Sequence, residues 1–300
     1  MTMTFIPTLA LLILSVCLPP HSVQGDAPES AGPAEVQPIK RLTEWPKADD
    51  LSDLRKDIRR LRAARTPEMV EEAHVALVKA GGAAAPHLIR LLDKEQDKQT
   101  LRHMREVLEA VTGVAHTRLL SEYFEDRSSI IRTWAMSRCA TLTDPGLRAV
   151  VQSVLNKIKA RGKKADPDER VAATLCLVST GSEKTLEQVI ELVGENWRRW
   201  GPTTLLALEA VRGKAATERV SALLSEKERN RQLLGLRLLG GCLEKERAPI
   251  VLPFLEGSDN GLRIAAINLL RQTIDGEPPL DRLPVFEAIE RANKWKIRLR

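Results

Sequence analysis

Four consecutive residues, Trp197-Arg198-Arg199-Trp200, form the densest group of side chains in the sequence that could recognise a partner. Tryptophan and arginine are enriched among the residues that contribute most to protein–protein binding, and an arginine can also stack on an indole ring. The sequence therefore makes this group a candidate partner-binding site. The alternative interpretation is that the indoles fill a junction between helices while the arginines are solvated.

A second basic group lies about 40 residues earlier and has the composition of a candidate anion-binding site. It comprises Lys157, Lys159, Arg161, Lys163 and Lys164. Phosphate groups or anionic lipids are the ligands that such a loop would suit, and the basic C-terminal residues would suit them as well. The simpler interpretation is a charge run exposed to solvent.

Two pairs of histidines share one spacing: His74 with His87, and His103 with His116, are each 13 residues apart. Imidazole is a common ligand of zinc and copper. When the two segments are aligned on the glycine that follows the first histidine of each pair, the histidines fall at different positions. No carboxylate lies at a spacing that would complete a metal site. We therefore predict histidines at surfaces or helix ends and no metal site, although the sequence leaves metal binding by these four residues open.

Catalytic motifs are absent from the sequence. It contains no glycine-rich phosphate loop, no Gly-x-Ser-x-Gly and no His-Glu-x-x-His. Its carboxylates alternate with Lys and Arg along helical faces. Cys139, Cys176 and Cys242 lie far apart in apolar runs, which is typical of buried thiols. We predict a protein that is not an enzyme, with no catalytic residue and no cofactor.

The elements that must position these side chains recur along the chain. Val107–Gly113 reads VLEAVTG and Ala207–Gly213 reads ALEAVRG, so five of seven positions are identical. Weaker copies lie at Val75–Gly81, Leu175–Gly181 and Leu234–Gly241. Each is an apolar helical run that ends at a glycine or turn and precedes a second amphipathic run. Turn points ~30–38 residues apart in a helical sequence indicate stacked helix pairs, because one pair cannot bury its own apolar stripes.

The composition agrees with helices rather than sheets. Apolar residues make up 43% of the chain and aromatic residues only 3%, whereas strands favour aromatic and β-branched side chains. We predict an all-α fold, an α-solenoid of about seven stacked antiparallel helix pairs in a right-handed curved array. The net charge of +6 permits an anionic partner without requiring one.

The N-terminal segment predicts export. Residues 1–25 contain no Lys, Arg, Asp or Glu, and their apolar run Phe5–Leu18 is too short to span a bilayer comfortably. We predict a signal peptide over residues 1–25, and hence a secreted or periplasmic protein without a transmembrane helix in its mature form. The alternative is a segment that is retained as an anchor, and lipidation at Cys17 is a weaker possibility.

The remaining chain divides by composition into four segments. Residues 26–50 are rich in Pro, Ala and Glu and predict a flexible linker. Residues 51–65 form a basic amphipathic helix, which would cap the array because the end of a solenoid needs a polar outer face. Residues 66–294 hold the repeats, and residues 295–300 form a basic C-terminal tail.

Helix pairs such as Ile131–Asp144 and Val171–Gly181 carry alanines in mid-helix and a Gly or Asp at the turn. In this they resemble HEAT repeats of the short bacterial kind, over about residues 66–294. The turns at Thr143-Asp144 and after Thr273 depart from that pattern because they lack its usual glycine. The resemblance implies an α-solenoid scaffold that binds partners, and it implies no catalytic residue.

Together these features predict an exported, non-enzymatic scaffold that mediates protein–protein interaction, with a partner and an oligomeric state that the sequence does not specify. The first alternative is a nucleic-acid-binding solenoid similar to the HEAT-like alkyl-base DNA glycosylases, using Trp134, Trp197 and Trp200. Nucleic acid is an unlikely partner for an exported protein, so this alternative requires retention in the cytoplasm. A second is a helper for cofactor attachment similar to the HEAT-like phycobilin lyases, which no residue specifically supports.

Overall fold

The protein is described by a computed structural model that covers residues 40–280 and 282–300. These residues form α-helices joined by turns, short 3₁₀ segments and one π-helical segment, Arg271–Asp275, and they contain no β-strand. The predicted all-α fold class is therefore confirmed for the part of the chain that the structure describes. The predicted signal peptide and residues 26–39 of the predicted linker lie outside the described residues.

The helices follow one another with short connections throughout. The first eight are α1 (Leu51–Ala63), α2 (Pro67–Ala80), α3 (Ala85–Ile89), α4 (Lys98–Val111), α5 (Thr117–Ser121), α6 (Ser129–Ala140), α7 (Arg148–Ala160) and α8 (Pro167–Ser179). The remainder are α9 (Leu186–Val193), α10 (Trp197–Leu208), α11 (Lys214–Ser221), α12 (Arg229–Cys242), α13 (Leu252–Glu256), α14 (Asn260–Leu270) and α15 (Val285–Leu299).

Several helices begin and end at the residues that the sequence indicates. Thr66 caps α2, accepting a hydrogen bond from the Met69 backbone N–H at 3.4 Å, and Pro67 occupies the first helical position. Asp97 caps α4 in the same way, accepting from the Thr100 N–H at 2.7 Å. Gly81 ends α2 with a φ of 61°, a conformation that costs glycine little.

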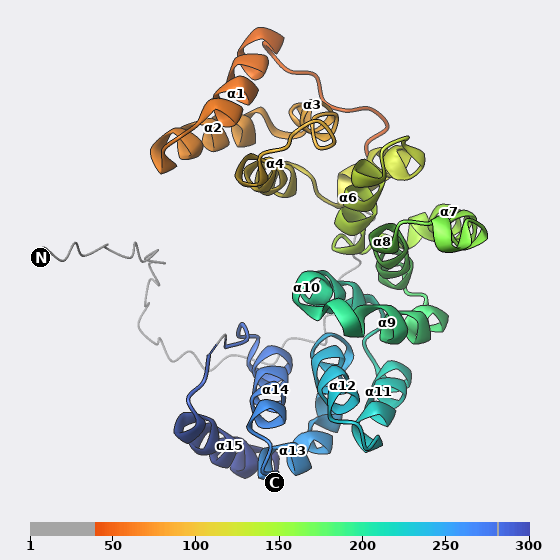
Figure 1. Cartoon of the computed structure of the whole chain (residues 1–300), viewed down its shortest axis with the longest axis vertical. Helices are drawn as coiled ribbons and strands as arrows, with labels where there is room; N and C mark the ends of the chain where they lie inside the picture. Colours follow the sequence, from red (N-terminus) through yellow and green to blue (C-terminus); the bar gives the residue numbers. More distant parts are fainter. Residues whose placement is uncertain (1–39, 281) are drawn as a thin grey trace, which may run out of the picture. The chain divides into compact units, whose positions relative to one another are not determined.

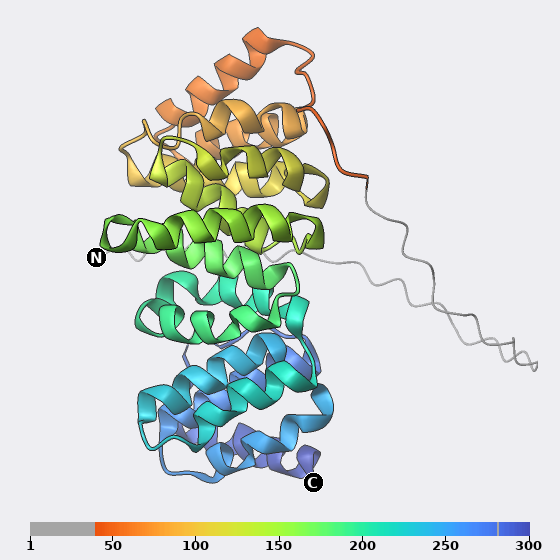
Figure 2. The ribbon, with the colours of Figure 1, turned by 90° about the vertical axis from the view of Figure 1, so that its right-hand side faces the viewer.

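Packing between helices follows the order of the chain. The even-numbered helices from α6 to α14 pack one on the next: α6 on α8, α8 on α10, α10 on α12 and α12 on α14. The helices between them in sequence pack against the same elements, as α7 does on α8 and α11 on α12. Figures 1 and 2 show that helices close in sequence also lie close in space. A side chain on α6 can therefore lie close to residues of α8 and α10.

Helix α8 is the most enclosed element of the fold. Ten of its 13 residues are buried, and it contacts α6, α7, α9 and α10. Its small residues Ala172, Ala173 and Thr174 let neighbouring helices approach from more than one side, and the Thr174 hydroxyl donates to the Arg170 carbonyl oxygen at 2.8 Å. Helices α6 and α10, which both pack on α8, also contact each other.

Two glycines that the sequence suggested as a helix stop lie inside α12. The helix continues through Gly240 and Gly241 to Cys242. A Cβ atom on Gly241 would lie 2.7 Å from the Leu205 carbonyl oxygen and 2.8 Å from the Leu208 Cβ. These glycines therefore allow close packing of α12 on α10, which is a tertiary requirement that the local pattern does not reveal.

Both ends of the described chain differ from the segments predicted for them. Residues 40–50 of the predicted linker are held to the helices: the Leu42 N–H donates to the Ala115 carbonyl oxygen at 2.8 Å, and the Arg41 guanidinium pairs with Asp144. The predicted tail, residues 295–300, is instead the last part of α15 up to Leu299, because Trp295 is buried and anchors it. No helix in the described residues is long and apolar enough to cross a membrane.

Candidate partner-binding groove

The Trp-Arg-Arg-Trp group forms the first turn of α10. Helix α10 begins at Trp197 and includes Pro202. Proline at this sixth position lacks the N–H that would donate to the Arg198 carbonyl oxygen, so α10 continues past a residue that interrupts its backbone hydrogen bonds. Gly201 makes room for the first tryptophan, because a Cβ there would lie 2.7 Å from Trp197 Cε2.

The helix divides these four residues between two surfaces. Trp197 and Arg198 border a pocket of about 740 Å³ with residues of α12 and α14, and the Arg237 guanidinium lies 5.5 Å from the Trp197 ring centroid. Arg199 and Trp200 border a different hollow with residues of α4 and α6. The four residues therefore face two different pockets although they are adjacent in the sequence, because neighbouring residues on a helix point in different directions.

The second hollow consists of two adjoining pockets of about 330 and 220 Å³, which share Glu109, Trp134, Ser137 and Thr203. We call it the α4–α6–α10 groove. Its other lining residues are Arg105 of α4, Ser129, Ile130, Thr133, Arg138 and Thr141 of α6 and its C-terminus, Asp166 and Asp168 at the start of α8, and Arg199, Trp200, Pro202 and Leu206 of α10. The larger pocket has the size of a small-ligand or side-chain site.

Two polar atoms in the wall of this groove lack hydrogen-bond partners. The Trp200 Nε1 and the Thr133 Oγ1 are buried, and neither has a partner among the described residues. Trp200 as a whole is only 3% exposed. A buried polar group without a partner costs about 1–3 kcal/mol, and most such groups in folded proteins are satisfied. Both residues line the same pocket.

Arginines supply the positive charge of the groove. The Arg199 guanidinium pairs with the Asp168 carboxylate at 2.6 Å and lies 5.3 Å from the Trp200 ring centroid. Arg105 forms no ion pair with any of the described residues. Desolvation by its surroundings, followed by the charge of Arg199, lowers the pKa of Arg105 from its ordinary value. The charge of Glu109, which lines the same pocket, raises the pKa of Arg105, so this cation has a carboxylate nearby but none within ion-pair distance among the described residues.

Apolar side chains stand at the rim. Ile130 borders the larger pocket and Leu206 the smaller one, and each is 45% exposed. Exposed aliphatic groups beside a tryptophan and arginines form the combination that dominates many protein interfaces. The groove can thus bury an apolar contact and pair a charge at the same time.

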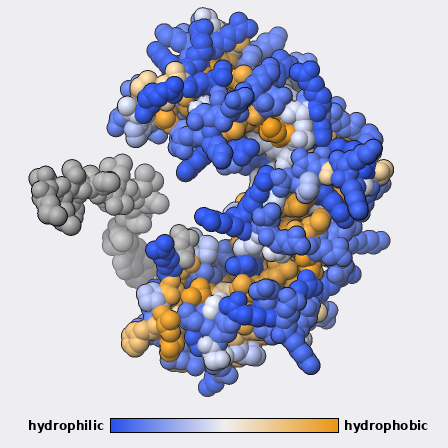
Figure 3. All heavy atoms as spheres, in the orientation of Figure 1, coloured by the Kyte–Doolittle hydropathy of each residue, from blue (hydrophilic) through white to orange (hydrophobic). Residues whose placement is uncertain are grey.

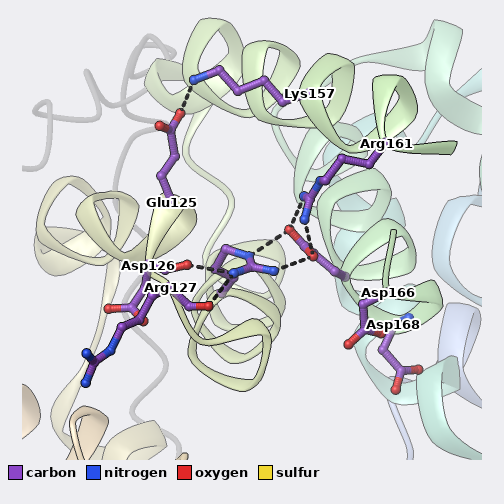
Figure 4. Close-up of polar contacts among 9 residues, drawn as sticks. Glu125, Asp126, Arg127, Lys157, Arg161, Asp166 and Asp168 are labelled. Carbon is purple, nitrogen blue, oxygen red and sulfur yellow. Dashed lines mark hydrogen bonds and ion pairs between the residues drawn. The ribbon is translucent and has the colours of Figure 1, made fainter. Parts of the chain in front are cut away.

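The predicted anion-binding loop is already partly neutralised by the protein (Figure 4). The Lys157 Nζ lies 2.5 Å from the Glu125 carboxylate. Arg161 pairs with a carboxylate of the next helix. In the described residues only Lys159, Lys163 and Lys164 of the predicted five are exposed and without a carboxylate within ion-pair distance. Anion binding by this loop stays a prediction that rests on these three lysines.

The carboxylate that holds Arg161 belongs to Glu169, which is completely buried at the start of α8. Arg161 donates to it at 2.6 and 3.2 Å, and Arg132 of α6 donates to both of its oxygens at 2.8 and 2.9 Å. Burial alone would raise the pKa of Glu169, but the two guanidinium groups hold it below its ordinary value. The cluster joins α6, α7 and α8 behind the groove.

The four histidines have separate surroundings. His116 stacks on Trp45, with ring centroids 5.5 Å apart, and its Nδ1 accepts from the Gly113 N–H at 3.1 Å. His103 lies within hydrogen-bond distance of Gln99 and Glu106, while burial followed by nearby arginines lowers the pKa of His87. The described residues contain no group of three His, Cys, Asp or Glu side chains placed to hold a metal ion.

Of the residues that line the larger pocket, the sequence singled out Arg199, Trp200 and Trp134 but not Arg105 or Thr133. Arg105 lies in an ordinary charged helical run, Arg102-His103-Met104-Arg105-Glu106, and a threonine such as Thr133 gives no chemical signal of its own. A usable signal was the spacing of Trp134 and Trp200, which are 66 residues apart, or two repeats of ~33 residues. Such spacing places residues on nearby even-numbered helices.

No protein-family model matches this sequence, and no curated protein sequence matches it.

Proposed function

We propose that the protein is a non-enzymatic scaffold that binds another protein through the α4–α6–α10 groove. In this proposal the helices form a HEAT-like α-solenoid of about seven stacked antiparallel pairs in a right-handed curved array. The contacts of α6, α8, α10, α12 and α14 in chain order support stacking. A solenoid presents side chains from several repeats on one extended surface, which suits recognition of a macromolecule.

A matched pair of threonines supports the repeat interpretation at the level of single residues. Thr117 and Thr217 lie at equivalent positions after the two best-matching helices, and both are completely buried. The Thr117 hydroxyl donates to the Asp144 carboxylate at 2.5 Å, and the Thr217 hydroxyl donates to the Cys242 carbonyl oxygen at 3.2 Å. Each threonine thus fastens its own helix pair to the turn of the following pair.

The observation that carries the binding proposal is one pocket lined by Trp200 and Thr133, each with a buried polar atom that has no partner among the described residues, and by Arg105, which forms no ion pair with them. The complementary group is an acidic side chain of the partner. Its carboxylate would pair with Arg105 and compete with Asp168 for Arg199. Movement of Arg199 would uncover the Trp200 ring over which it lies, so that the indole N–H could donate to the partner.

Nucleic-acid binding is the less favoured alternative. Stacking of bases requires an open aromatic face, and Trp134 and Trp200 are only 7% and 3% exposed. Arg237 lies over the Trp197 ring. An acidic and partly apolar protein segment suits the exposed Ile130 and Leu206 better than a sugar-phosphate backbone does.

We also propose that the partner is met outside the cytoplasm, in the periplasm or after secretion. This part rests on the sequence of residues 1–25, which lack charged side chains and contain one apolar run followed by Pro19 and Pro20. An envelope or secreted fraction is therefore the appropriate material from which to isolate the partner.

The proposal is tested by replacing the two groove arginines together, Arg105→Ala with Arg199→Ala. After the partner has been isolated, its affinity for the purified variant is measured by titration calorimetry. We expect a loss of at least about tenfold, equivalent to ~1.4 kcal/mol, because a partner carboxylate would lose both cations. We also expect the affinity of the unaltered protein to fall with added salt.

Arg198→Ala supplies the matched control. Arg198 is an exposed arginine in the same turn of α10 but borders the other pocket. Its replacement should leave the affinity within about twofold of the original value. Equal affinities for the control, the double variant and the unaltered protein would remove the groove from consideration.

A further inference from the structure

Three side chains of α6 correspond to three side chains of the neighbouring helix α8 at one constant separation in the sequence. Each α6 residue lies 37 positions before its α8 counterpart, and the pairs are Arg132 with Glu169, Ala135 with Ala172, and Cys139 with Cys176. Within each helix the three members are spaced i, i+3 and i+7, so they share one face. The sequence therefore places two cysteines at equivalent positions on two helices that pack together.

Hydrogen bonds at both ends of α6 and α8 support the same register in space. Near the N-termini, Arg132 donates to both oxygens of Glu169 at 2.8 and 2.9 Å. Near the C-termini, Arg148, which begins α7 after the turn that follows α6, donates to the Thr180 carbonyl oxygen directly after α8 at 2.5 Å. The two helices therefore run in the same direction, and residues 37 positions apart lie at the same height along them.

Small side chains separate α6 from α8 between these two ends. Ala135 and Ala172 are completely buried in the middle of the matched faces. The distance between packed helices depends on the side chains at their contact. A disulfide requires Cα atoms no more than about 7 Å apart, so a contact made by alanines favours one.

Both thiols lie inside this interface. Cys139 is 1% exposed and Cys176 is 0% exposed, and both are free thiols in the structure. Burial, followed by the neighbouring Cys176 thiol, raises the pKa of Cys139 well above its ordinary value. Figure 3 shows that hydrophilic residues cover most of the face seen in Figure 1, and the two thiols lie beneath the protein surface. Cys242, by contrast, belongs to α12, which packs on α10 and α14.

We propose that Cys139 and Cys176 form a disulfide bond that links α6 to α8 when the protein folds in an oxidising compartment. Disulfides form and persist in secreted and periplasmic proteins. The compartment rests on the proposed export, whereas the pairing rests on the packing of α6 and α8 alone. Both helices contribute residues to the α4–α6–α10 groove, Thr133 from α6 and Asp168 from α8, so the bond would fix these two walls relative to each other.

Formation of the bond is a thiol–disulfide exchange with an external disulfide, that of a thiol oxidoreductase or of oxidised glutathione. One cysteine loses its proton to water and attacks a sulfur of the external disulfide, which releases its other sulfur as a thiolate. The second cysteine, likewise deprotonated, attacks the mixed disulfide, and the second external thiolate leaves. The two cysteines thus lose two protons and two electrons, and the external disulfide is reduced to two thiols. Because both cysteines are buried in the folded protein, we expect the exchange to occur before α6 and α8 close together.

The first test refolds the full chain from urea with oxidised and reduced glutathione, blocks the remaining thiols with iodoacetamide and digests the protein with trypsin. Cleavage after Lys and Arg separates the four cysteines into four peptides, residues 1–40, 139–148, 171–184 and 238–245. We expect the linked pair of 139–148 with 171–184 to exceed every other linked pair at least about tenfold, because a disulfide forms only between cysteines that lie close together. Cys242→Ala should leave this pair unchanged. Alkylated Cys139 and Cys176, or similar amounts of every pairing, would overturn the proposal.

The second test compares urea denaturation of the refolded protein with and without dithiothreitol. The bond should lower the equilibrium constant for unfolding at least about a hundredfold, because it restricts the unfolded chain. Cys176→Ser is the control, and its unfolding should be the same under both conditions. Equal unfolding of the unaltered protein under both conditions would show that no bond forms in the native arrangement of α6 and α8.

Protein isolated from the envelope or secreted fraction and alkylated at harvest separates this proposal from the proposed export. The linked pair of peptides in that material would support both. Free thiols in the isolated protein, together with the linked pair after refolding, would contradict the export and support the pairing. Free thiols at Cys139 and Cys176 in both samples would overturn the disulfide.

Discussion

At the residue scale, the side chains that decide the structure are those whose partners come from another helix pair. Arg161 is an example: in the sequence it belongs to a basic loop that suggests an external anion, yet its anion is Glu169 of the same protein. The interpretation from the sequence could not anticipate this, because Glu169 is also approached by Arg132 from a helix 37 residues earlier. Local charge runs do not show which carboxylates the fold will bury beside them.

The buried cluster leads to a prediction about stability. Glu169→Gln should lower the free energy of unfolding by about 3 kcal/mol, because it leaves Arg132 and Arg161 without their common carboxylate. The measurement is urea denaturation at pH 7. Glu125→Gln is the control, since the Lys157–Glu125 pair beside it is about 60% exposed on both sides, and such pairs contribute ~1 kcal/mol or less. Equal losses of unfolding free energy in the two variants would show that the buried cluster stabilises the protein no more than an exposed ion pair does.

Lowering the pH should remove the difference in the free energy of unfolding between the Glu169→Gln variant and the unaltered protein. The pKa of Glu169 is held below its ordinary value of 4.5, so the stability linked to its ionisation is present above pH 4.5 and is lost as the pH falls through the lowered value. Near that lower pH the unaltered side chain is protonated and resembles glutamine. Denaturation curves that stay equally far apart at every pH would contradict the role assigned to the two arginines.

At the element scale, the helices were predictable where a local signal sets their ends and unpredictable where packing does. Thr66-Pro67 and Gly81 bound α2 as expected. Pro202 and Gly241, by contrast, lie inside helices, because tertiary contacts compensate for their poor helix propensity. The last helix extends into the predicted tail, residues 295–300, because Trp295 anchors it. In each case the deciding contact is made with another helix, which a single-sequence pattern does not contain.

The contact of α12 with α10 can be tested at Gly241. Gly241→Ala should lower the free energy of unfolding by about 1–3 kcal/mol, because the new methyl group meets the α10 backbone, even though alanine favours a helix. Thermal and urea unfolding measure the change. At the adjacent Gly240 a Cβ would meet the ends of two side chains, of Gln272 and Leu205, so Gly240→Ala should cost less. A stabilised Gly241→Ala variant would show that the helices do not depend on this close approach.

At the scale of the whole molecule, the sequence predicts helical character and a repeated unit but not the groove. The groove exists because α6 and α10 both pack on α8 and also contact each other, which brings Thr133 and Trp200 into one pocket. That juxtaposition depends on how much side-chain volume separates alternate helices. The repeat spacing indicates which helices can be neighbours, and the packing of side chains decides which of those helices come into contact.

Site-specific photocross-linking tests the central claim, that the α4–α6–α10 groove binds the protein partner. A benzophenone amino acid replaces Thr203, which both pockets share, or Ser153, which is exposed on α7 away from the groove. Each protein is illuminated in the native envelope fraction, and the adducts are identified by mass spectrometry. The account predicts one protein adduct from position 203 that is absent from position 153. No adduct from position 203, or the same adduct from both positions, would contradict it.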